Sequence, residues 1–181
     1  MKLLRTLITA SSLMLPALAS AQDVKIDFDK AYDFSTVKTY SIAIGTKWGN
    51  DLSERRVLTE IDEAIAAKGW KKVDAAQANA IVVLHGATQT KKSANTFYSG
   101  MGGYGGYGYR GFGGMGSSQT VVSEYAVGTL IVDIFDAKNK QLIFRGTAED
   151  EISDNPEKNA KRLEKASTKL FKDFPPKAKA K

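Results

Sequence analysis

The chain of 181 residues is long enough for one domain with a hydrophobic core. Its hydrophobic content of 43% and charged content of 25% are ordinary for a folded protein, and a formal net charge of +6 is too mild to indicate a nucleic-acid partner. The absence of cysteine excludes a disulfide framework, a cysteine nucleophile and lipid attachment at a lipobox cysteine.

The first 21 residues have the pattern of a secretory signal peptide, in which Lys2 and Arg5 precede a short apolar stretch and small residues. Cleavage after Ala19 or after Ala21 fits the Ala-x-Ala rule, and we favour Ala21. The apolar stretch is short for a membrane span, which needs about 20 residues. We therefore predict a bacterial periplasmic or secreted protein with no transmembrane segment after cleavage, whose formal net charge falls to +4 without Lys2 and Arg5.

Three segments of the first half of the chain have the pattern of strands. Residues 24–29 alternate apolar and polar side chains, and residues 38–44 form a second such run. The segment 79–92 opens with residues that are apolar on both faces, as in a central strand. A single helix between the second and third strands suits a crossover connection, which predicts that these two strands are parallel.

The segment 52–68 has apolar residues at helical spacing, which predicts a helix packed on the sheet. We expect Asp51 and Glu54 to form a capping box at its start. Gly69 stands where a left-handed residue commonly ends a helix.

A hairpin is predicted between residues 119–135 and residues 142–146. Asn139, in the polar turn between them, is the candidate for a positive φ angle. Asp133 and Arg145 fall on the same face of the two strands, which predicts a cross-strand ion pair with a structural role.

The last predicted element is a helix over about residues 156–174, with Asn155 as N-cap and Pro156 at the first helical position. The element order is β-β-α-β-β-β-α. We therefore predict an α+β fold, a mixed and mostly antiparallel sheet with two helices on one face. The domain is expected to span residues 22–176 and to precede a basic tail at 177–181.

Residues 100–116 hold ten of the 16 glycines of the chain. Glycine loses more backbone entropy on folding than any other residue, so a segment this rich in glycine is incompatible with a helix or an ordinary strand interior. The strands expected on either side indicate a disordered insertion at about residues 99–118. Two GxGxxG matches, beginning at Gly103 and Gly106, do not open a helix after a strand, so we reject a dinucleotide-binding interpretation.

Three interpretations of this glycine-rich tract remain open. It is a loop that only connects two strands, a contact surface for an envelope component, or a segment that self-associates through Gly/Tyr-rich stacking. A contact surface would bind protein, peptidoglycan, another glycan or a membrane surface, because aromatic faces suit sugar rings and cations. The candidate contact residues are Tyr104, Tyr107, Tyr109, Arg110 and Phe112.

The sequence has no catalytic constellation, and we predict no catalytic, cofactor-binding or metal-binding residues. His85 is the only histidine and has no cysteine partner, which favours a structural or edge-facing role at the end of its strand. Acidic residues gather at 27–33, without the calcium-loop pattern, and at 149–154, just before a predicted helix. We interpret both groups as solvated surface.

Four motifs in chain order resemble the DUF4136 family of bacterial envelope proteins. DFSTVKTY at 33–40 is similar to its D-F-S-x-x-K-T-Y opening, and GTLIVDIFD at 128–136 to its G-T-L-x-I-D strand. LIFRG at 142–146 and FPP at 174–176 resemble its L-V-W-R-G strand and F-P-P ending. Family members often have tryptophan where this chain has Ile42 and Phe144, and many look like lipoproteins. The resemblance implies an envelope location and no particular activity.

We therefore expect a non-enzymatic periplasmic or envelope-associated domain that works by binding or scaffolding. One alternative is a hydrolase of envelope polymers, which would need two acids facing each other across a concave pocket. Another alternative is a small-ligand carrier, which would need a sizeable apolar pocket between the sheet and the helices.

Overall fold

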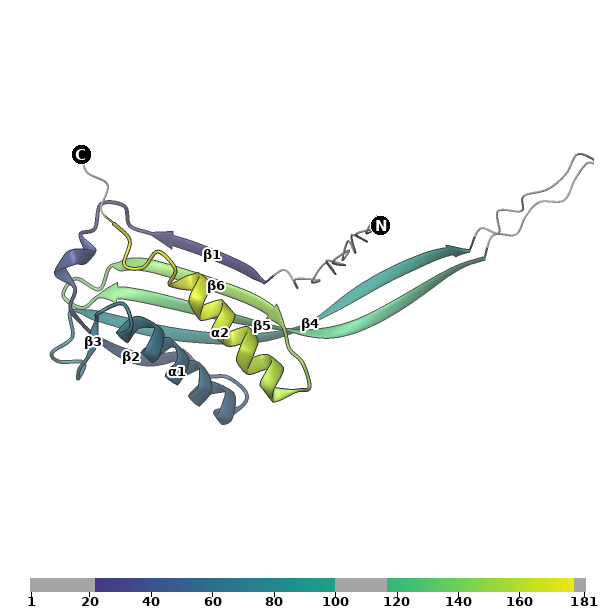
Figure 1. Ribbon diagram of the computed structural model, residues 1–181, viewed down its shortest axis with the longest axis horizontal. Coiled ribbons are helices and arrows are strands. Elements are labelled where there is room, and N and C mark those ends of the chain that lie inside the picture. Colours follow the sequence, from purple (N-terminus) through teal and green to yellow (C-terminus); the bar gives the residue numbers. More distant parts are fainter. Residues whose placement is uncertain (1–21, 100–116, 178–181) are drawn as a thin grey trace, which may run out of the picture.

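The computed structural model describes residues 22–99 and 117–177, which form one mixed sheet covered by two helices (Figure 1). A short 3-10 turn, η1, also lies between the first two strands. The strands are β1 (Asp23–Phe28), β2 (Thr39–Thr46), β3 (Lys71–Lys72), β4 (Ala80–Ser99), β5 (Ser117–Asp136) and β6 (Leu142–Glu151); the helices are α1 (Asp51–Ala66) and α2 (Pro156–Leu170), and η1 spans Phe34–Thr36.

The order of the strands across the described sheet is β1-β6-β5-β4-β2-β3. β2 runs parallel to β4, as the crossover through α1 predicts, and β3 is parallel to β2. The other neighbours are antiparallel. The predicted fold class is confirmed. The two-residue strand β3 was not predicted, because its two exposed lysines form no periodic pattern.

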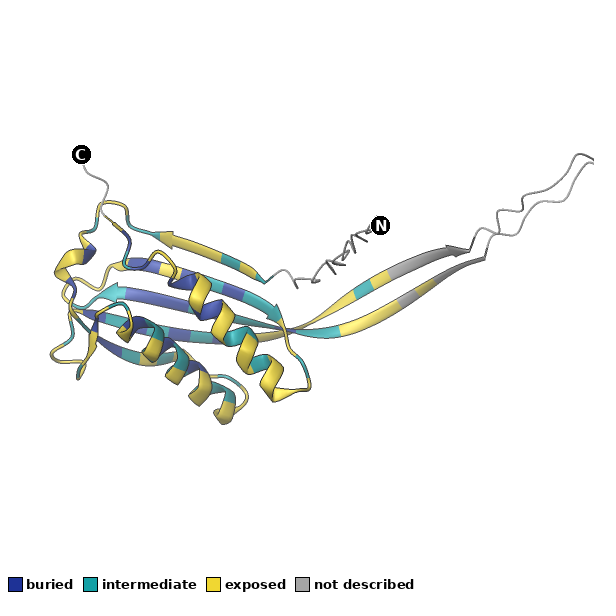
Figure 2. Ribbon diagram, viewed as in Figure 1, coloured by how far each residue is buried: buried dark blue, intermediate teal, exposed yellow. Residues whose placement is uncertain are grey.

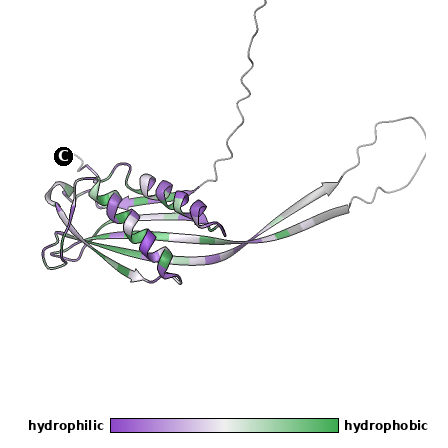
Figure 3. Cartoon of the chain, turned by 60° about the horizontal axis from the view of Figure 1, so that its bottom comes forward, coloured by the Kyte–Doolittle hydropathy of each residue, from purple (hydrophilic) through white to green (hydrophobic). Residues whose placement is uncertain are grey.

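Both helices cover the same face of the sheet, and the opposite face carries no helix of the described chain (Figure 1). In Figure 2 the buried, dark blue segments of the ribbon lie in the central strands and on the sides of the helices that face the sheet, whereas much of the rest of both helices is exposed. Hydrophilic residues dominate the exposed parts of both helices in Figure 3. The largest fully buried side chains are Tyr40, Phe144, Phe171, Ile61, Ile65, Leu84, Ile134, Ile143, Leu170, Val37, Val82 and Val132.

The start of α1 differs from the predicted capping box. Asn50 is the N-cap, and its side chain accepts hydrogen bonds from the backbone N–H groups of Leu52 and Ser53. Asp51 is instead the first helical residue, where its negative charge interacts favourably with the positive end of the helix dipole. At the other end of the helix, Gly69 has a φ of 90°, as predicted.

The turn between β5 and β6 places its positive φ angle at Lys140 (61°), not at Asn139. Asn139 instead accepts a hydrogen bond from the N–H group of Gln141 with its side-chain oxygen, which holds it in the preceding turn. The Asp136 carboxylate completes that turn by accepting from the N–H groups of Lys138 and Asn139.

The second helix begins as predicted, with Asn155 as N-cap and Pro156 in the first turn. It ends at Leu170 rather than near Phe174, because the chain turns off at Phe171. Phe174 is nevertheless buried, and its ring packs edge-on against Trp70 and Phe144.

Strands β4 and β5 are longer than predicted and continue far beyond the body of the domain (Figure 1). β2 pairs with β4 only as far as His85, and β6 pairs with β5 only as far as Val127. From Lys91↔Tyr125 to Ser99↔Ser117 the two strands pair only with each other, over nine residue pairs. At about 3.3 Å per residue this two-stranded arm is about 30 Å long.

Candidate functional site

The predicted contact residues of the glycine-rich tract lie outside the described residues: Tyr104, Tyr107, Tyr109, Arg110 and Phe112. The arm leads to them from both sides, because β4 ends at Ser99 and β5 begins at Ser117, in register. Three regions of the described chain are then candidates for function: the arm, the helix-free face of the sheet, and a cleft between the two helices.

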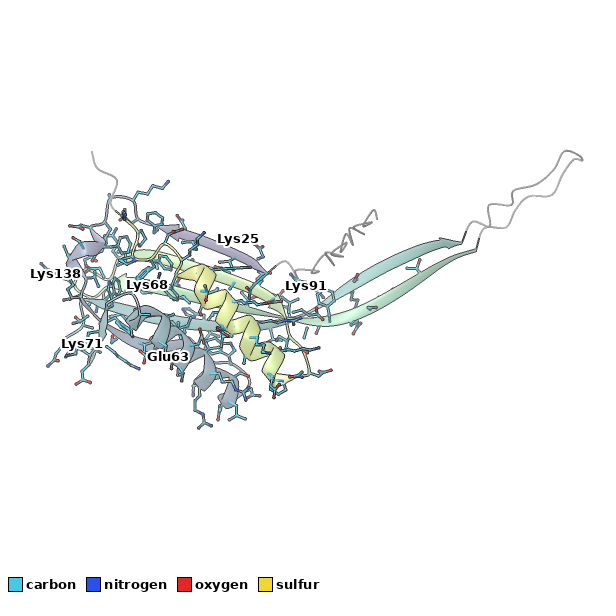
Figure 4. The ribbon with its side chains drawn as sticks, in the orientation of Figure 1. Lys25, Glu63, Lys68, Lys71, Lys91 and Lys138 are labelled. Atoms are coloured by element: carbon cyan, nitrogen blue, oxygen red, sulfur yellow. The ribbon has the colours of Figure 1, made fainter. Side chains whose placement is uncertain are left out.

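The base of the arm is exposed and charged. Lys92 and Glu124 stand directly opposite each other and form an ion pair of 2.8 Å. Lys91, at the point where the arm leaves the body (Figure 4), reaches Glu149 of β6 at 3.4 Å. Such exposed pairs contribute about 0–1 kcal/mol each to stability. Lysines on free strand edges also discourage unwanted strand pairing.

The helix-free face of the sheet contains the predicted Asp133–Arg145 ion pair. The guanidinium donates from Nε and Nη2 to the two carboxylate oxygens, at 2.6 Å each. Asp133 is 2% exposed, whereas half of the Arg145 side chain remains accessible. The hydrogen bonds to Asp133 raise the pKa of Arg145 above its usual range. The predicted pairing of these two residues is confirmed.

His85 extends this polar group on the same face of the sheet. Its Nδ1 lies 3.0 Å from Oγ1 of Thr46, and its Nε2 lies 3.9 Å from Oδ2 of Asp133. The ring covers Gly45, where a Cβ atom would collide with it. His85 lies inside β4, because the strand continues to Ser99, and not at the predicted strand end. Asp133 is already held by Arg145, so this arrangement suits a polar brace across β2, β4, β5 and β6.

Two tyrosine–aspartate hydrogen bonds brace the end of the body opposite the arm. The Tyr32 hydroxyl donates to Asp136 at 2.6 Å; burial, followed by this bond, raises the pKa of Tyr32 to about 12. The same hydrogen bond lowers the pKa of Asp136. The Tyr40 hydroxyl donates to Asp62 at 2.7 Å, and burial is the main cause of its raised pKa.

The cleft lies over the sheet beside the N-terminal half of α1 and most of α2, and it has a volume of about 500 Å³. Its α1 side runs from Asn50 to Val57, and its α2 side runs from Pro156 to Ala166. The sheet contributes Leu130 as an apolar lining residue. We call this the helix cleft.

Two glycines in adjacent strands make room for large apolar side chains of the helix cleft. The Trp48 indole lies on Gly86 so closely that any Cβ atom there would collide with it. Ile152 lies over Gly128, where a Cβ atom would be 3.2 Å away. A glycine inside a strand often marks such a close approach, so Gly86 and Gly128 were the sequence signal for this cleft, which sequence reasoning missed.

Polar residues line the helix cleft on several sides: Asn50, Ser53 and Arg56 lie at the start of α1, and others lie near the start of β1 and the end of β6. Gln22 donates from Nε2 to the Arg162 carbonyl at 2.8 Å, whereas its Oε1 is buried and accepts no hydrogen bond from the described residues. Arg162 approaches Asp150 at 3.8 Å and donates to the Glu151 carbonyl. The acids that line the cleft, Glu149, Asp150 and Glu151, all come from one strand end.

The described residues contain no cluster of three or more metal-ligating side chains. Within the same ranges, no helix combines the length and the apolar character needed to span a membrane.

The model of the family described as "Domain of unknown function (DUF4136)" matches residues 24–176. The chain belongs to this family. Its fold is similar to that of a DUF4136 family protein from Bacteroides thetaiotaomicron, with a TM-score of 0.51 and 13% identity over 85% of this chain and 96% of that one. The residues that the family model matches include all four motifs, from DFSTVKTY at 33–40 to FPP at 174–176.

Two further solved structures resemble most of this DUF4136 chain. A PDZ domain protein from Parabacteroides distasonis has a TM-score of 0.50 and 13% identity over 86% of this chain, which spans only 36% of that protein. A PelC dodecamer from Paraburkholderia phytofirmans has a TM-score of 0.49 and 9% identity over 83% of this chain and 95% of that one. These likenesses concern the fold alone. No curated protein matches the sequence.

Proposed function

We propose that this DUF4136 protein is a non-enzymatic, periplasmic or envelope-associated domain whose arm presents the glycine-rich tract to an envelope component. The single observation that carries the proposal is the arm itself. Nine residue pairs of β4 and β5 extend beyond every other strand of the described sheet (Figure 1). A ribbon of two strands buries little apolar surface, so its length adds reach rather than stability.

The tract at the end of the arm supplies the chemistry for contact with protein, peptidoglycan or a membrane surface. Its contact residues would be Tyr104, Tyr107, Tyr109, Arg110 and Phe112, whose rings and guanidinium suit sugars, cations and anionic groups. The signal-like residues 1–21 support export, and cleavage after Ala21 or Ala19 is tested by sequencing the N-terminus of the exported protein.

Deletion of residues 100–116 tests the proposal. We expect the melting temperature to stay within a few degrees of the natural chain, while retention in the envelope fraction falls severalfold. A matched variant keeps the tract length and replaces the four aromatic residues with serine and Arg110 with glutamine. Equal loss in both variants assigns retention to the side chains, whereas unchanged retention in both contradicts the proposal.

The two alternative functions are a hydrolase of envelope polymers and a small-ligand carrier, and the geometry of the helix cleft supports the carrier better. For a hydrolase, the acids of the helix cleft come from one strand end, and no acid of α1 lines the opposite wall. Inverting or retaining hydrolysis needs two separated carboxylates that face the substrate. A small-ligand carrier has a specific observation in its favour, the apolar volume between the helices and the sheet.

A further inference from the structure

We propose that the outward face of α2 binds a linear acidic polysaccharide with one carboxylate on each sugar, of the polyuronate type. The binding surface is a row of four lysines along the helix, which we call the lysine row: Lys158, Lys161, Lys165 and Lys169. The row is separate from the arm, and none of its members lines the helix cleft. The inference therefore does not depend on the function that we propose for the arm.

The spacing of the lysine row places it on one side of α2. Its members follow one another at intervals of three or four residues, and side chains at such intervals share one face of a helix. The buried residues of the helix, Ala166, Ser167 and Leu170, lie on the other side. At about 1.5 Å per residue the row is about 17 Å long, and successive lysines are about 4.5–6 Å apart along the axis.

The ammonium groups of the lysine row have no partner in the described part of the chain. All four residues are exposed, and none takes part in an ion pair within residues 22–99 and 117–177. Arg162, the neighbouring cation of the helix, is instead turned toward Asp150 and the Glu151 carbonyl. Like charges at helical spacing repel each other, so a bound polyanion would relieve an arrangement that the fold does not itself compensate.

The positive charge of the chain is concentrated around this helix. Residues 156–181 hold nine Lys and Arg against three Asp and Glu, whereas residues 22–155 hold 15 against 17. The neighbouring helix α1 has the opposite sign, with five acids and two arginines. Because Glu60 of α1 accepts a hydrogen bond from Ser167 of α2, the two helices lie side by side. The positive surface is therefore a strip one helix wide, next to an acidic helix.

The narrow strip favours a linear polymer over a flat surface or a second protein. Both helices cover the same face of the sheet, so a bilayer resting on them would meet the acids of α1 together with the lysine row (Figure 1). The row also offers a bilayer no apolar side chain to insert. A protein partner needs an apolar centre to its interface, where lysine is depleted. A linear polyanion follows the strip and leaves the acids of α1 uncovered.

The type of cation favours carboxylates carried by sugar rings. A lysine ammonium acts as a point charge, whereas bidentate recognition of phosphate is typical of arginine. The interval between successive lysines of the row is close to the length of one pyranose residue. A polyuronate therefore offers one carboxylate for each ammonium, whereas a polyphosphate, with a charge on every phosphorus atom, is charged more densely than the row.

Titration of the exported full chain with a fluorescently labelled octamer of galacturonic acid tests the inference. The comparison probes are a neutral glucan octamer, monomeric galacturonic acid, and phosphatidylglycerol vesicles at equal anionic charge. We expect saturable binding of the acidic octamer and at least tenfold weaker binding of each comparison probe. Its affinity should fall about tenfold when the salt rises from about 50 to about 200 mM. No binding of the acidic octamer, equal binding of the neutral glucan, or tighter binding to vesicles would overturn the inference.

Two matched variants separate the lysine row from the net charge. Replacement of all four row lysines with glutamine keeps good helix formers at exposed positions and should lower the affinity at least tenfold. The control removes the same charge from four scattered, exposed lysines and should stay within about threefold of the natural chain: Lys30→Gln, Lys47→Gln, Lys71→Gln and Lys138→Gln. An equal loss in both variants would show that only net charge matters, which contradicts a site on α2.

Two further measurements distinguish the lysine row from the other surfaces. Sedimentation should give the same particle mass for the natural chain and the glutamine variant of the row, and a dimer lost in that variant would assign the row to a second copy instead. The chain that lacks residues 100–116 should bind the acidic octamer as the natural chain does. Loss of binding there would move the contact to the glycine-rich tract, so failure of this inference is distinguishable from failure of the proposed arm function.

Discussion

Strands β4 and β5 pass through two environments along their length. In the body, β4 lies between β2 and β5, and β5 lies between β4 and β6, with α1 and α2 covering one face of the sheet. Leu84 and Ile134 are fully buried there. In the arm the same two strands pair only with each other, and Val122 is 58% exposed.

The difference shows that hydrogen bonding alone does not decide where a strand contributes stability. Both halves of the ladder keep their register from Ala80↔Asp136 to Ser99↔Ser117. Only the body half adds the burial of apolar side chains, the dominant favourable term in folding. An isolated two-stranded hairpin is only marginally stable in water. We therefore expect the arm to open locally at a lower free energy than the body.

The largest expected effect is that of Ile134→Ala in the body half of β5. The side chain is fully buried, and truncation leaves a cavity that the sheet and helices cannot refill. We expect a loss of about 3–4 kcal/mol in the free energy of unfolding, measured by urea denaturation. A loss below about 1 kcal/mol would show that this half of the strand is not part of the core.

A smaller loss of unfolding free energy is expected from Arg145→Met. This substitution leaves the buried Asp133 carboxylate without its bidentate partner. Removal of one partner of a buried pair costs more than the net value of the pair. Because half of Arg145 is exposed, we expect about 2–3 kcal/mol by urea denaturation. The double variant Asp133→Asn/Arg145→Met should recover part of this loss, and no recovery would contradict the assigned cause.

Asp136→Asn should cost about 1–2 kcal/mol at pH 7, because the carboxylate accepts hydrogen bonds from the Tyr32 hydroxyl and from two backbone N–H groups. Its folded-state pKa is lowered, first by Tyr32. The contribution is therefore present above the unfolded pKa of about 4 and is lost as the pH falls through the lower folded value.

The difference in unfolding free energy between the natural chain and Asp136→Asn should accordingly be constant above about pH 5 and shrink below pH 4. Urea denaturation across this range measures it. Tyr32→Phe serves as control, since it removes the main cause of the lowered pKa and should weaken the pH dependence. A difference that grows toward acid pH would have the wrong sign for this assignment.

The smallest effect is expected from Val122→Ala in the arm half of β5. The side chain is exposed, so its truncation should change the unfolding free energy by less than about 0.5 kcal/mol. Set beside Ile134→Ala, it compares two apolar truncations in one strand. A loss near that of Ile134→Ala would mean that the arm packs against something that the isolated domain lacks, such as another copy of the chain.

The sequence by itself determined the elements whose signal is local. Alternation at 24–29 and helical spacing before Gly69 depend only on neighbouring residues, and Asn155 followed by Pro156 defines a helix start without tertiary help. The Asp133–Arg145 pair was also predictable, because the turn between β5 and β6 fixes their register.

Tertiary structure decided the features that depend on which surfaces meet. The burial of Phe174 beyond the end of α2 depends on Trp70 and Phe144, which come from distant parts of the chain. The helix cleft required Trp48 to lie on Gly86 across separate elements. Such contacts join residues far apart in sequence, and no local periodicity encodes them.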